Sequence, residues 1–551
     1  MTPAEMRRSE ILAKLEADGG VRVGPLAQLF GVSEVTIRSD LTILARQGRL
    51  RRVHGGGLRR GGGDSGLDQH VRRHSRPQRW IAERAAVLIE DGDVVFIDGS
   101  PIGLLIAQRL YGRRDVTVVT NSIPVGRVAA DGVAASVVLL GGALRPGSSA
   151  TVPDAASAGV AGARIGRAFV AADALSFEDG LALADVALAG SLRELLDAAP
   201  EVIALVESTA FARLGGATVL GLDRVSCVFV DERVAPEHLA RLQQRGVPVT
   251  ICGEHRSTHV PAAAAPGRRW KIGFANVSEE IQMAVRIRRS IERAAAAAGT
   301  VDLMLADNRI DGPTSLRNAE RFIDAGVDLV INYFHLARYG DIISSRLRTA
   351  GIPVISVNAS MAGTRYFGVD NYLVGRMGGA AAGRAAAARW GRRIDRVIVV
   401  SLLQANENTV ARMYAQLEAL RELVDAPDER VDQLAILPVR AEARAAVETL
   451  LAAHAADRRI VVLCTNDDSA LGAADALRAA GRDADAVVVG QGGASDGREA
   501  LADPTSPIVA TVSYHPERYG DQVIPYALDI LEGRLVPPAI IVEAELLERT
   551  S

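Results

Sequence analysis

"GVSEVTIRSDLTILARQGRLRRVHGGG" occupies residues Gly31–Gly57 and decides how the first part of the chain folds. Ser33 can begin a helix, because its hydroxyl can accept hydrogen bonds from the free amides of the first turn. Ile37, Leu41 and Leu44 follow at i, i+4 and i+7, which is the spacing of one buried helical stripe. The stretch therefore predicts a short amphipathic helix.

The flanking residues complete a recognisable unit. Upstream, "VGPLAQLFG" predicts another short helix with Leu26, Leu29 and Phe30 facing inward, and Gly31 ends it in a tight turn. After Gly48, "RLRRVHGGG" alternates and then breaks on glycines, as a β-wing does. Two helices joined by a tight turn and followed by a wing predict a winged helix-turn-helix over residues 1–60.

The solvent-facing side of the second helix carries residues that can read DNA bases. Arg38 suits guanine, Val35 suits the thymine methyl group, and hydroxyl side chains suit several partners. The basic residues of the wing can bind phosphates. A helical protein-interaction module with a solvated basic face is the alternative. The predicted DNA-contacting residues are Ser33, Val35, Thr36, Arg38, Ser39, Thr42, Arg51, Arg52 and His54.

Charge is distributed unevenly along the chain. Residues 1–63 hold eleven Lys and Arg against six Asp and Glu, whereas the whole chain has a net charge of −3. A basic head on an acidic body favours a polyanionic partner for the head. We therefore expect duplex DNA to be that partner.

Length and composition narrow the remaining possibilities. At about 150 residues per domain, 551 residues predict roughly three or four domains. The first twenty residues are too charged for a signal peptide, and no apolar run reaches the ~18 residues needed to span a bilayer. Cys227, Cys252 and Cys464 lie far apart without metal-ligand spacing. These features predict a cytoplasmic protein with reduced thiols and without a cofactor, a metal or a membrane partner.

Two α/β segments follow the head. A Gly- and Arg-rich linker is expected over residues 61–79, and short β-rich runs such as "VVFIDGS" and "VTVVTNS" then alternate with helical stretches over 80–255. A Pro- and Ala-rich linker is expected over 256–269, and a second alternation fills 270–551. Such alternation is typical of parallel sheets covered by helices.

Polar residues recur where the predicted strands of the last segment end. Ligands of open parallel sheets bind beyond the carboxyl ends of the strands, so this recurrence predicts a ligand cleft. The alternative is that these residues only form turns. The residues are Asn276, Asp307, Asn332, Asn358, Gln404, Asn466, Asp467 and Gln491.

Residues 6–57 resemble the winged helix-turn-helix of DeoR-type bacterial repressors, and the motif "VSEVTIRSDLTILARQGRLRRVHGG" carries the resemblance. The resemblance implies a DNA-reading role for Ser33, Thr36 and Arg38. Ser39 stands where the family usually has a second arginine, which leaves the operator sequence open.

Residues 80–255 resemble the DeoR-type sensor domain, whose fold is shared with sugar-phosphate isomerases. The resemblance implies a phosphate-binding loop after the first strand, but Pro101 lacks an amide donor and Ile102 lacks a hydroxyl there. Where the family has a lysine in a motif like "DSSK", this chain has Glu207-Ser208-Thr209-Ala210. We expect the domain to keep the fold, to have lost the phosphosugar site and to serve in oligomerisation. An intact site with unusual ligands is the alternative.

Residues 271–545 resemble periplasmic sugar-binding proteins and the effector domains of LacI-type repressors. The resemblance rests on "AGIPVISVNAS", "FGVDNYLVGR", "CTNDDSALGAADALRAAGR" and "ATVSYHPERYGDQVIPYALDILEGR". It implies two lobes joined by crossings near Asp370–Tyr372, Val512–Tyr514 and Pro538–Ile540.

The same resemblance implies an effector site between the lobes. Asn358 stands at a hydroxyl-binding position, and Gln491 can compensate for an aspartate that is Gly492 here. Tyr333, Phe334 and His335 can supply a stacking face. The predicted effector-binding residues are Asn276, Asn332, Asn358, Arg412, Asn466, Asp467, Gln491, Tyr514 and His515.

Together these patterns predict an α/β protein with an N-terminal winged helix-turn-helix, a DeoR-sensor or isomerase-like domain and a two-lobed domain of the periplasmic-binding-protein type I class. We expect a homo-oligomer, a dimer or a tetramer, that represses carbohydrate-uptake or catabolism genes under the control of a small neutral sugar or polyol. No catalytic residues are predicted. The alternatives are a sugar-phosphate isomerase or deaminase-like enzyme fused to a DNA-binding head, and a DNA-architectural protein with inert domains.

Overall fold

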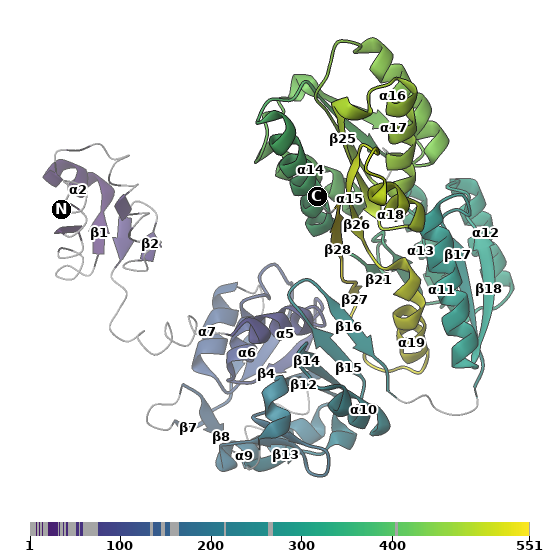
Figure 1. The fold of residues 1–551 in the computed structure, drawn as a ribbon. Helices are drawn as coiled ribbons and strands as arrows, with labels where there is room; N and C mark the ends of the chain where they lie inside the picture. Colours follow the sequence, from purple (N-terminus) through teal and green to yellow (C-terminus); the bar gives the residue numbers. More distant parts are fainter. Residues whose placement is uncertain are drawn as a thin grey trace. The chain divides into compact units, whose positions relative to one another are not determined.

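The computed structural model divides the chain into two compact units, Met1–Ser75 and Arg76–Ser551 (Figure 1). Across the residues that it describes, no helix is long and apolar enough to cross a bilayer. The described residues are 7, 10, 11, 14, 20–30, 32, 37, 40, 41, 44, 51–53, 56–58, 75–132, 136–144, 149–154, 165–213, 216–262, 268–402 and 406–549.

The first unit contains the predicted wing. β2 (Arg51–Val53) and β3 (Gly56–Leu58) form a tight antiparallel hairpin in which Val53 faces Gly56. β1 (Gly20–Arg22) adds to β3, and α2 (Val23–Phe30) follows β1 directly. The predicted stripe is confirmed, because Ile37, Leu41 and Leu44 are at most 2% exposed and share a core with Ile11 and Leu26.

The prediction that Leu29 faces inward is wrong, because its side chain is 61% exposed. Leu26 is buried in α2, and Ala27 and Phe30 are half-buried. At 100° per residue these three lie within one arc, whereas Leu29 lies on the other side of Leu26. The apolar residues of this short helix are compatible with two different buried faces. In the structure, the buried face is the one that includes Ala27.

An eight-stranded sheet forms the next domain, in the order β16-β15-β14-β12-β9-β4-β5-β6. All neighbouring strands are parallel except β15 and β16, which confirms the predicted α/β alternation. The helices of this domain are α5 (Arg76–Ala86), α6 (Pro101–Ala107), α7 (Ile123–Gly132), α9 (Val186–Ala198) and α10 (Pro236–Gln244). The strands are β4 (Val94–Ile97), β5 (Thr117–Thr120), β6 (Val137–Leu139), β9 (Arg167–Ala171), β12 (Glu201–Val206), β14 (Cys227–Asp231), β15 (Val249–Cys252) and β16 (Ser257–Val260).

Part of the predicted linker is a strand. Residues 256–269 include β16, which runs antiparallel to β15 at the edge of the eight-stranded sheet. Ser257 and His259 are buried, whereas Thr258 and Val260 are half-buried, as expected for alternating side chains of a strand.

Two further sheets of six strands define two lobes (Figure 1). The lobe 1 sheet consists of β17 (Trp270–Asn276), β18 (Val301–Asp307), β19 (Leu329–Asn332), β20 (Val354–Val357), β21 (Arg365–Gly368) and β27 (Ala539–Ile541). The lobe 2 sheet consists of β22 (Arg396–Ser401), β23 (Val431–Ala435), β24 (Ile460–Cys464), β25 (Ala486–Gly492), β26 (Ile508–Ser513) and β28 (Glu545–Glu548). Most of these strands are almost entirely buried, because helices cover both faces of a parallel sheet.

Most helices of each lobe connect its parallel strands. Lobe 1 contains α11 (Gln282–Ala298), α12 (Gly312–Asp324), α13 (Ala337–Thr349) and α19 (Tyr519–Leu531). Lobe 2 contains α14 (Asn371–Trp390), α15 (Glu407–Arg421), α16 (Arg440–Ala453), α17 (Asp467–Ala479) and α18 (Ser495–Ala502).

The chain passes three times between the lobes. It leaves lobe 1 between β21 and α14, returns between β26 and α19, and leaves again between β27 and β28. The first two passages agree with the predicted crossings. The third was predicted at Pro538–Ile540, but Ala539–Ile541 form β27, which pairs with β21, and the chain crosses only at residues 542–544.

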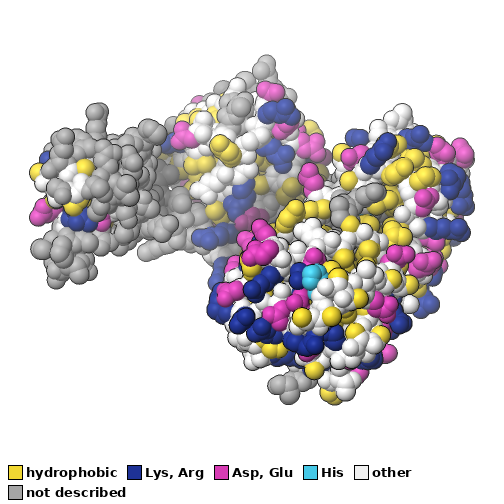
Figure 2. Space-filling model, turned by 90° about the horizontal axis from the view of Figure 1, so that it is seen from above, with side chains coloured by type: hydrophobic (Ala, Val, Ile, Leu, Met, Phe, Trp, Pro, Cys, Tyr) yellow, Lys and Arg dark blue, Asp and Glu magenta, His cyan; other side chains and the backbone are white. Residues whose placement is uncertain are grey.

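On the face shown in Figure 2, basic and acidic side chains are interspersed over the described surface. Many charged side chains of the described residues form ion pairs at the surface, such as Arg376 with Glu422 and Arg392 with Asp425. Exposed pairs of this kind contribute about 0–1 kcal/mol each. This face therefore lacks a broad area of one sign that would attract a polyanion.

Candidate effector cleft and DNA-binding head

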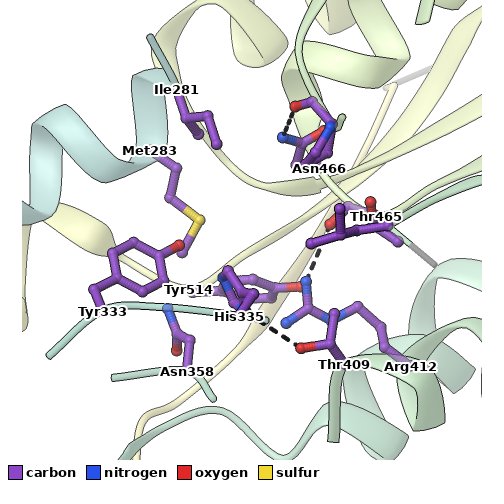
Figure 3. A pocket seen from close by; sticks show the side chains of 12 residues that line it. Ile281, Met283, Tyr333, His335, Asn358, Thr409, Arg412, Thr465, Asn466 and Tyr514 are labelled. Atoms are coloured by element: carbon purple, nitrogen blue, oxygen red, sulfur yellow. Dashed lines mark hydrogen bonds between the residues drawn. The ribbon is translucent and has the colours of Figure 1, made fainter. Parts of the chain in front are cut away.

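A cavity of about 50 Å³ lies between the two lobes (Figure 3). Lobe 1 contributes Ile281, Met283, Tyr333, His335 and Asn358. Lobe 2 contributes Leu402, Thr409, Arg412, Pro438, Thr465 and Asn466, and Tyr514 follows β26 at the second crossing. Several of these residues come directly after parallel strands, where an open α/β sheet binds its ligands.

Arg412, on α15, is the central polar side chain of the cavity (Figure 3). Its side chain is only 6% exposed, so hydrogen bonds to other protein groups replace those to water. Its Nε and one terminal nitrogen donate to Asn371 Oδ1 at 2.9 and 2.5 Å, and the other terminal nitrogen donates to the Thr465 carbonyl at 3.0 Å. The guanidinium carbon lies 5.2 Å from the centre of the Tyr514 ring. Since a guanidinium has five N–H groups, two remain for a ligand.

Aromatic side chains surround the guanidinium. Tyr333 and His335 meet edge to face with ring centres 5.1 Å apart. Burial, and secondly the charge of Arg412, lower the pKa of His335 to about 3. The imidazole is therefore neutral at physiological pH. Burial also raises the pKa of Tyr514, whose hydroxyl donates to Gln491 Oε1.

Two polar atoms at the cavity have no hydrogen-bond partner among the described residues: Asn358 Nδ2 and Thr465 Oγ1. Asn358 adopts a left-handed backbone conformation with φ of 55°, and its Oδ1 accepts a hydrogen bond from the Tyr519 hydroxyl at 2.9 Å. Leaving a buried polar group unpaired costs about 1–3 kcal/mol. Ligand oxygens at these two atoms would remove that cost.

Part of the wall is apolar and consists of Ile281, Met283, Leu402 and Pro438. Such a wall can pack against the C–H groups of a sugar or polyol, while the polar groups bind its oxygens. The cavity thus combines an apolar surface with a few placed donors.

The lobes contact each other around the cavity. The Asn406 amide donates to the His335 carbonyl at 3.0 Å, and Asn406 Nδ2 donates to the Ser360 carbonyl at 3.1 Å. The cavity is about a third of the ~150 Å³ cavity that admits benzene in another protein. A sugar can therefore enter only after the lobes separate.

Four of the predicted effector-binding residues line the cavity: Asn358, Arg412, Asn466 and Tyr514. Asn466 also begins α17, since its Oδ1 accepts the Ser469 amide at 2.9 Å. The other five lie outside the cavity lining. They are Asn276, Asn332, Asp467, Gln491 and His515.

Three of these five have their polar atoms engaged within their own lobe. Asn276 Nδ2 donates to the Ser278 carbonyl at 3.2 Å and to Glu279 at 2.7 Å. The amide nitrogen of Asn332 points to Met361 Sδ at 3.5 Å. Asp467 accepts the Thr511 hydroxyl at 2.6 Å.

Gln491 contacts a residue of the lining, whereas His515 lies beside two glutamates. Gln491 donates to the Val374 carbonyl at 3.1 Å and accepts from the Tyr514 hydroxyl, so it holds that ring in place. His515 follows Tyr514 with φ of 51° and lies 3.7 Å from Glu517 and 3.6 Å from Glu545.

Of the suggested stacking face, Tyr333 and His335 line the cavity, whereas Phe334 is buried in another cluster of lobe 1. Sequence reasoning missed Ile281, Met283, Leu402, Thr409, Pro438 and Thr465. The position of Thr465, directly before Asn466 at the end of β24, was a usable signal. The apolar residues of the lining gave no such signal in the sequence. Gln404 lies outside the described residues.

Carboxylates occupy the strand ends of the eight-stranded sheet. After β4, Asp98 accepts the Ser100 hydroxyl at 2.6 Å and the Ala171 amide at 2.7 Å, and burial raises its pKa to about 6. Asp231, which ends β14, accepts the Ser208 amide at 2.7 Å. Glu207 follows β12 and accepts from Gln78 Nε2 at 2.8 Å. Asp231 also forms an ion pair with the exposed Arg233 at 2.9 Å, so the negative charge that disfavours a phosphate at this edge is that of Asp98 and Glu207.

No group of three or more His, Cys, Asp or Glu side chains among the described residues could hold a metal ion. Burial raises the pKa of Cys227, Cys252 and Cys464, which are free thiols.

Family comparisons assign each segment. Residues 7–59 match the model of the DeoR-like helix-turn-helix domain, and residues 73–232 match that of the DeoR C-terminal sensor domain. The lactose phosphotransferase system repressor of Lactococcus lactis subsp. lactis is 31% identical over 244 residues, which cover 43% of this chain and 95% of that protein. The chain belongs to the DeoR family.

Another relative matches a similar share of the chain. The transcriptional regulator GolR of Listeria innocua serovar 6a is 25% identical, over 46% of this chain and 99% of that protein. In this DeoR-family protein a further domain follows, since residues 272–535 match the model of a periplasmic binding protein domain.

Solved structures similar to the chain include a Mycobacterium smegmatis protein in complex with β-D-fucofuranose and the Caulobacter myo-inositol-binding protein. The first is 22% identical, covers 51% of this chain and 91% of that chain, and has a TM-score of 0.45. The second is 21% identical, covers 52% and 95%, and has a TM-score of 0.45.

Most predicted DNA-contacting residues of the DeoR-like head lie outside the described residues: Ser33, Val35, Thr36, Arg38, Ser39, Thr42 and His54. Arg51 and Arg52 are placed in β2 by their backbone alone. Their contacts with DNA stay predictions.

Proposed function

We propose that this DeoR-family protein represses genes for carbohydrate uptake or catabolism, and that a small sugar or polyol bound between lobes 1 and 2 controls it. The observation that carries the proposal is the cavity between the lobes, which is lined both by Arg412 and by apolar side chains. A polyhydroxylated ligand needs both surfaces, because it carries oxygens and C–H groups.

The names of the relatives support a regulator over an enzyme. One is named as a repressor of the lactose phosphotransferase system and another as a transcriptional regulator. The carboxylates at the strand ends of the eight-stranded sheet are unsuited to a sugar-phosphate isomerase, whose substrate is anionic. We accordingly propose a non-catalytic protein that acts in the cytoplasm on operator DNA.

The domain that contains the eight-stranded sheet, called the middle domain below, is proposed to serve in oligomerisation. A dimer or tetramer would place two reading heads on two half-sites of the operator. Closure of the lobes on the effector would then change how the heads are held, provided that the effector binds one arrangement more tightly.

DNA reading is tested with the full-length protein on a duplex selected from a random pool. Arg38→Ala should cost about 1–3 kcal/mol on the selected duplex and much less on random DNA, because a bidentate contact to guanine is lost. Arg114→Ala, which changes an exposed arginine of the middle domain, is the matched control. Equal losses on both duplexes would exclude base reading by Arg38.

Effector control is tested by titrating sugars and polyols while operator binding is followed. We expect at least one neutral or acidic sugar to change operator affinity, and hexose 6-phosphates to have no effect. Release of the operator by a sugar phosphate would contradict the proposed loss of the phosphosugar site.

A further inference from the structure

The charge that lines the cavity is unbalanced. Arg412 is the one charged side chain among the lining residues, and it makes no ion pair with any described residue. Residues 263–267, 403–405, 550 and 551, which lie outside the described part of this domain, include no Asp or Glu. A buried charge without a partner is costly, so a compensating negative charge is expected to come from elsewhere.

The carboxylates next in sequence to Asn466 and Asn371 are committed to other groups. Asp467 accepts the Thr511 hydroxyl and the Ala494 amide, and the charge that favours its ionised form is that of Arg498. Asp468 accepts a hydrogen bond from the Gln282 amide. Asp370 is exposed and accepts the Leu373 amide at the start of α14.

The uncommitted donors fit a carboxylate. Asn371 and Thr465 use three of the five guanidinium N–H groups, which leaves one on each terminal nitrogen of Arg412. These two N–H groups can bind the two oxygens of a carboxylate. Asn358 Nδ2 adds another donor without a partner. A phosphate monoester would bring about −1.5 to −2 charges against this single cation, whereas a carboxylate brings one.

We propose that the effector is a sugar acid, an aldonic or uronic acid whose carboxylate binds Arg412 and whose hydroxyl-bearing chain packs on the wall of Ile281, Met283 and Leu402. This inference rests on the proposed function and narrows its effector from sugars in general to monocarboxylates. It departs from the neutral ligand that the sequence predicts, because the structure shows the lining without an acid.

The test uses thermal unfolding and calorimetry of the full-length protein with matched acid and alcohol pairs. The pairs are D-glycerate and glycerol, D-xylonate and xylitol, D-gluconate and D-glucitol, and D-galactonate and galactitol, with sodium chloride added to equal ionic strength. At least one acid should raise Tm and bind tenfold or more tightly than its alcohol.

Variants locate the binding. Arg412→Gln should abolish the response to the acid, and Arg412→Lys, which keeps the charge but loses the fork, should retain a weakened response. Asn358→Asp keeps the acceptor for Tyr519, tolerates the left-handed backbone and adds a carboxylate, so it should reduce the preference for the acid at least tenfold. Arg384→Gln, a half-exposed arginine paired with Glu548, is the control and should respond as the wild type does.

The outcomes separate this inference from the proposed function. An alcohol that binds as tightly as its acid overturns the sugar acid and leaves a sugar-controlled repressor standing. An acid response that survives both Arg412→Gln and Asn358→Asp also overturns it. Failure of every acid to bind also overturns the sugar acid, and the titration with sugars and polyols then decides the proposed function.

Discussion

Asp468, at the start of α17, is a single side chain whose ionisation is coupled to the contact between the lobes. It is 7% exposed and accepts a hydrogen bond from the Gln282 amide of lobe 1. Burial, and secondly its neighbour Asp467, raise its pKa to about 6. The unfolded chain has the ordinary value near 3.9. Between about pH 4 and pH 6 the folded state therefore binds the proton more tightly, and the free energy of unfolding falls as the pH rises.

Asp468→Asn should remove this contribution. The free energy of unfolding of the variant, relative to wild type, should increase as the pH rises from about 4 to 6 and then stay constant. Urea unfolding between pH 4 and 8 measures it. Asp503→Asn is a control of opposite sign, because hydrogen bonds from Thr505 lower the pKa of Asp503. A pH-independent difference for Asp468→Asn would show that its carboxylate is not buried between the lobes.

At this scale the sequence reached only part of the cavity. Arg412 and Asn358 were found because motif positions point to them. A strand-end position does not say which way a side chain turns, and Asp467 turns to the Ala494 amide and the Thr511 hydroxyl. Met283 was missed because an apolar residue in a helix predicts a core position whether or not a ligand lies beside it.

At the scale of elements, the close approach of α14 and α15 positions Arg412. Gly375 and Gly379 lie four residues apart and face α15. A Cβ at Gly379 would lie 2.0 Å from the Gln416 carbonyl oxygen, and one at Gly375 would lie 2.3 Å from that of Arg412. These contacts involve backbone, which cannot turn away, so the helices would have to separate.

Gly379→Ala should therefore destabilise the protein by about 1–3 kcal/mol, the usual cost of overpacking. Gly190→Ala in α9 is the matched control, since nothing lies within 4 Å of its Cβ position and the residue is exposed. It should stabilise by about 0.5–1 kcal/mol, because alanine favours a helix. Urea unfolding of both variants measures these changes in the free energy of unfolding. A stabilised Gly379→Ala would mean that α14 and α15 are not packed so closely.

The order of strands and helices was predictable from alternation, because buried parallel strands read as short apolar runs. Elements whose position depends on contacts with residues far away in the sequence were not predictable in this way. The β16 segment stands beside a Pro- and Ala-rich stretch and was taken as a linker, although Ser257 and His259 find partners in lobe 1. The predicted burial of Leu29 is wrong for a similar reason, since its exposure depends on which face of α2 packs against the rest of the head.

At the scale of the whole molecule, β16 joins two domains. Its backbone belongs to the eight-stranded sheet, while its side chains bond to lobe 1. His259 Nε2 lies 2.6 Å from Asp529 Oδ2 on α19, and both side chains are 1% exposed. Arg534 bonds the other oxygen of Asp529 at 2.6 Å, and Ser257 Oγ accepts the Ile541 amide of β27 at 3.0 Å. Lobe 1 and the middle domain should therefore respond to lobe closure as one body.

His259→Ala tests this joint. The variant leaves Asp529 Oδ2 buried without its donor, which should cost about 1–3 kcal/mol. In Arg256→Ala, the lost partners Glu543 and Glu232 are 57% and 29% exposed, so water can replace the guanidinium and the change should cost about 1 kcal/mol or less. Scanning calorimetry should show lobe 1 and the middle domain unfolding together in wild type and in Arg256→Ala, but in separate transitions in His259→Ala. If both variants unfold like wild type, the two domains are held together by something other than the buried pair, and the effector signal must reach the head by another contact.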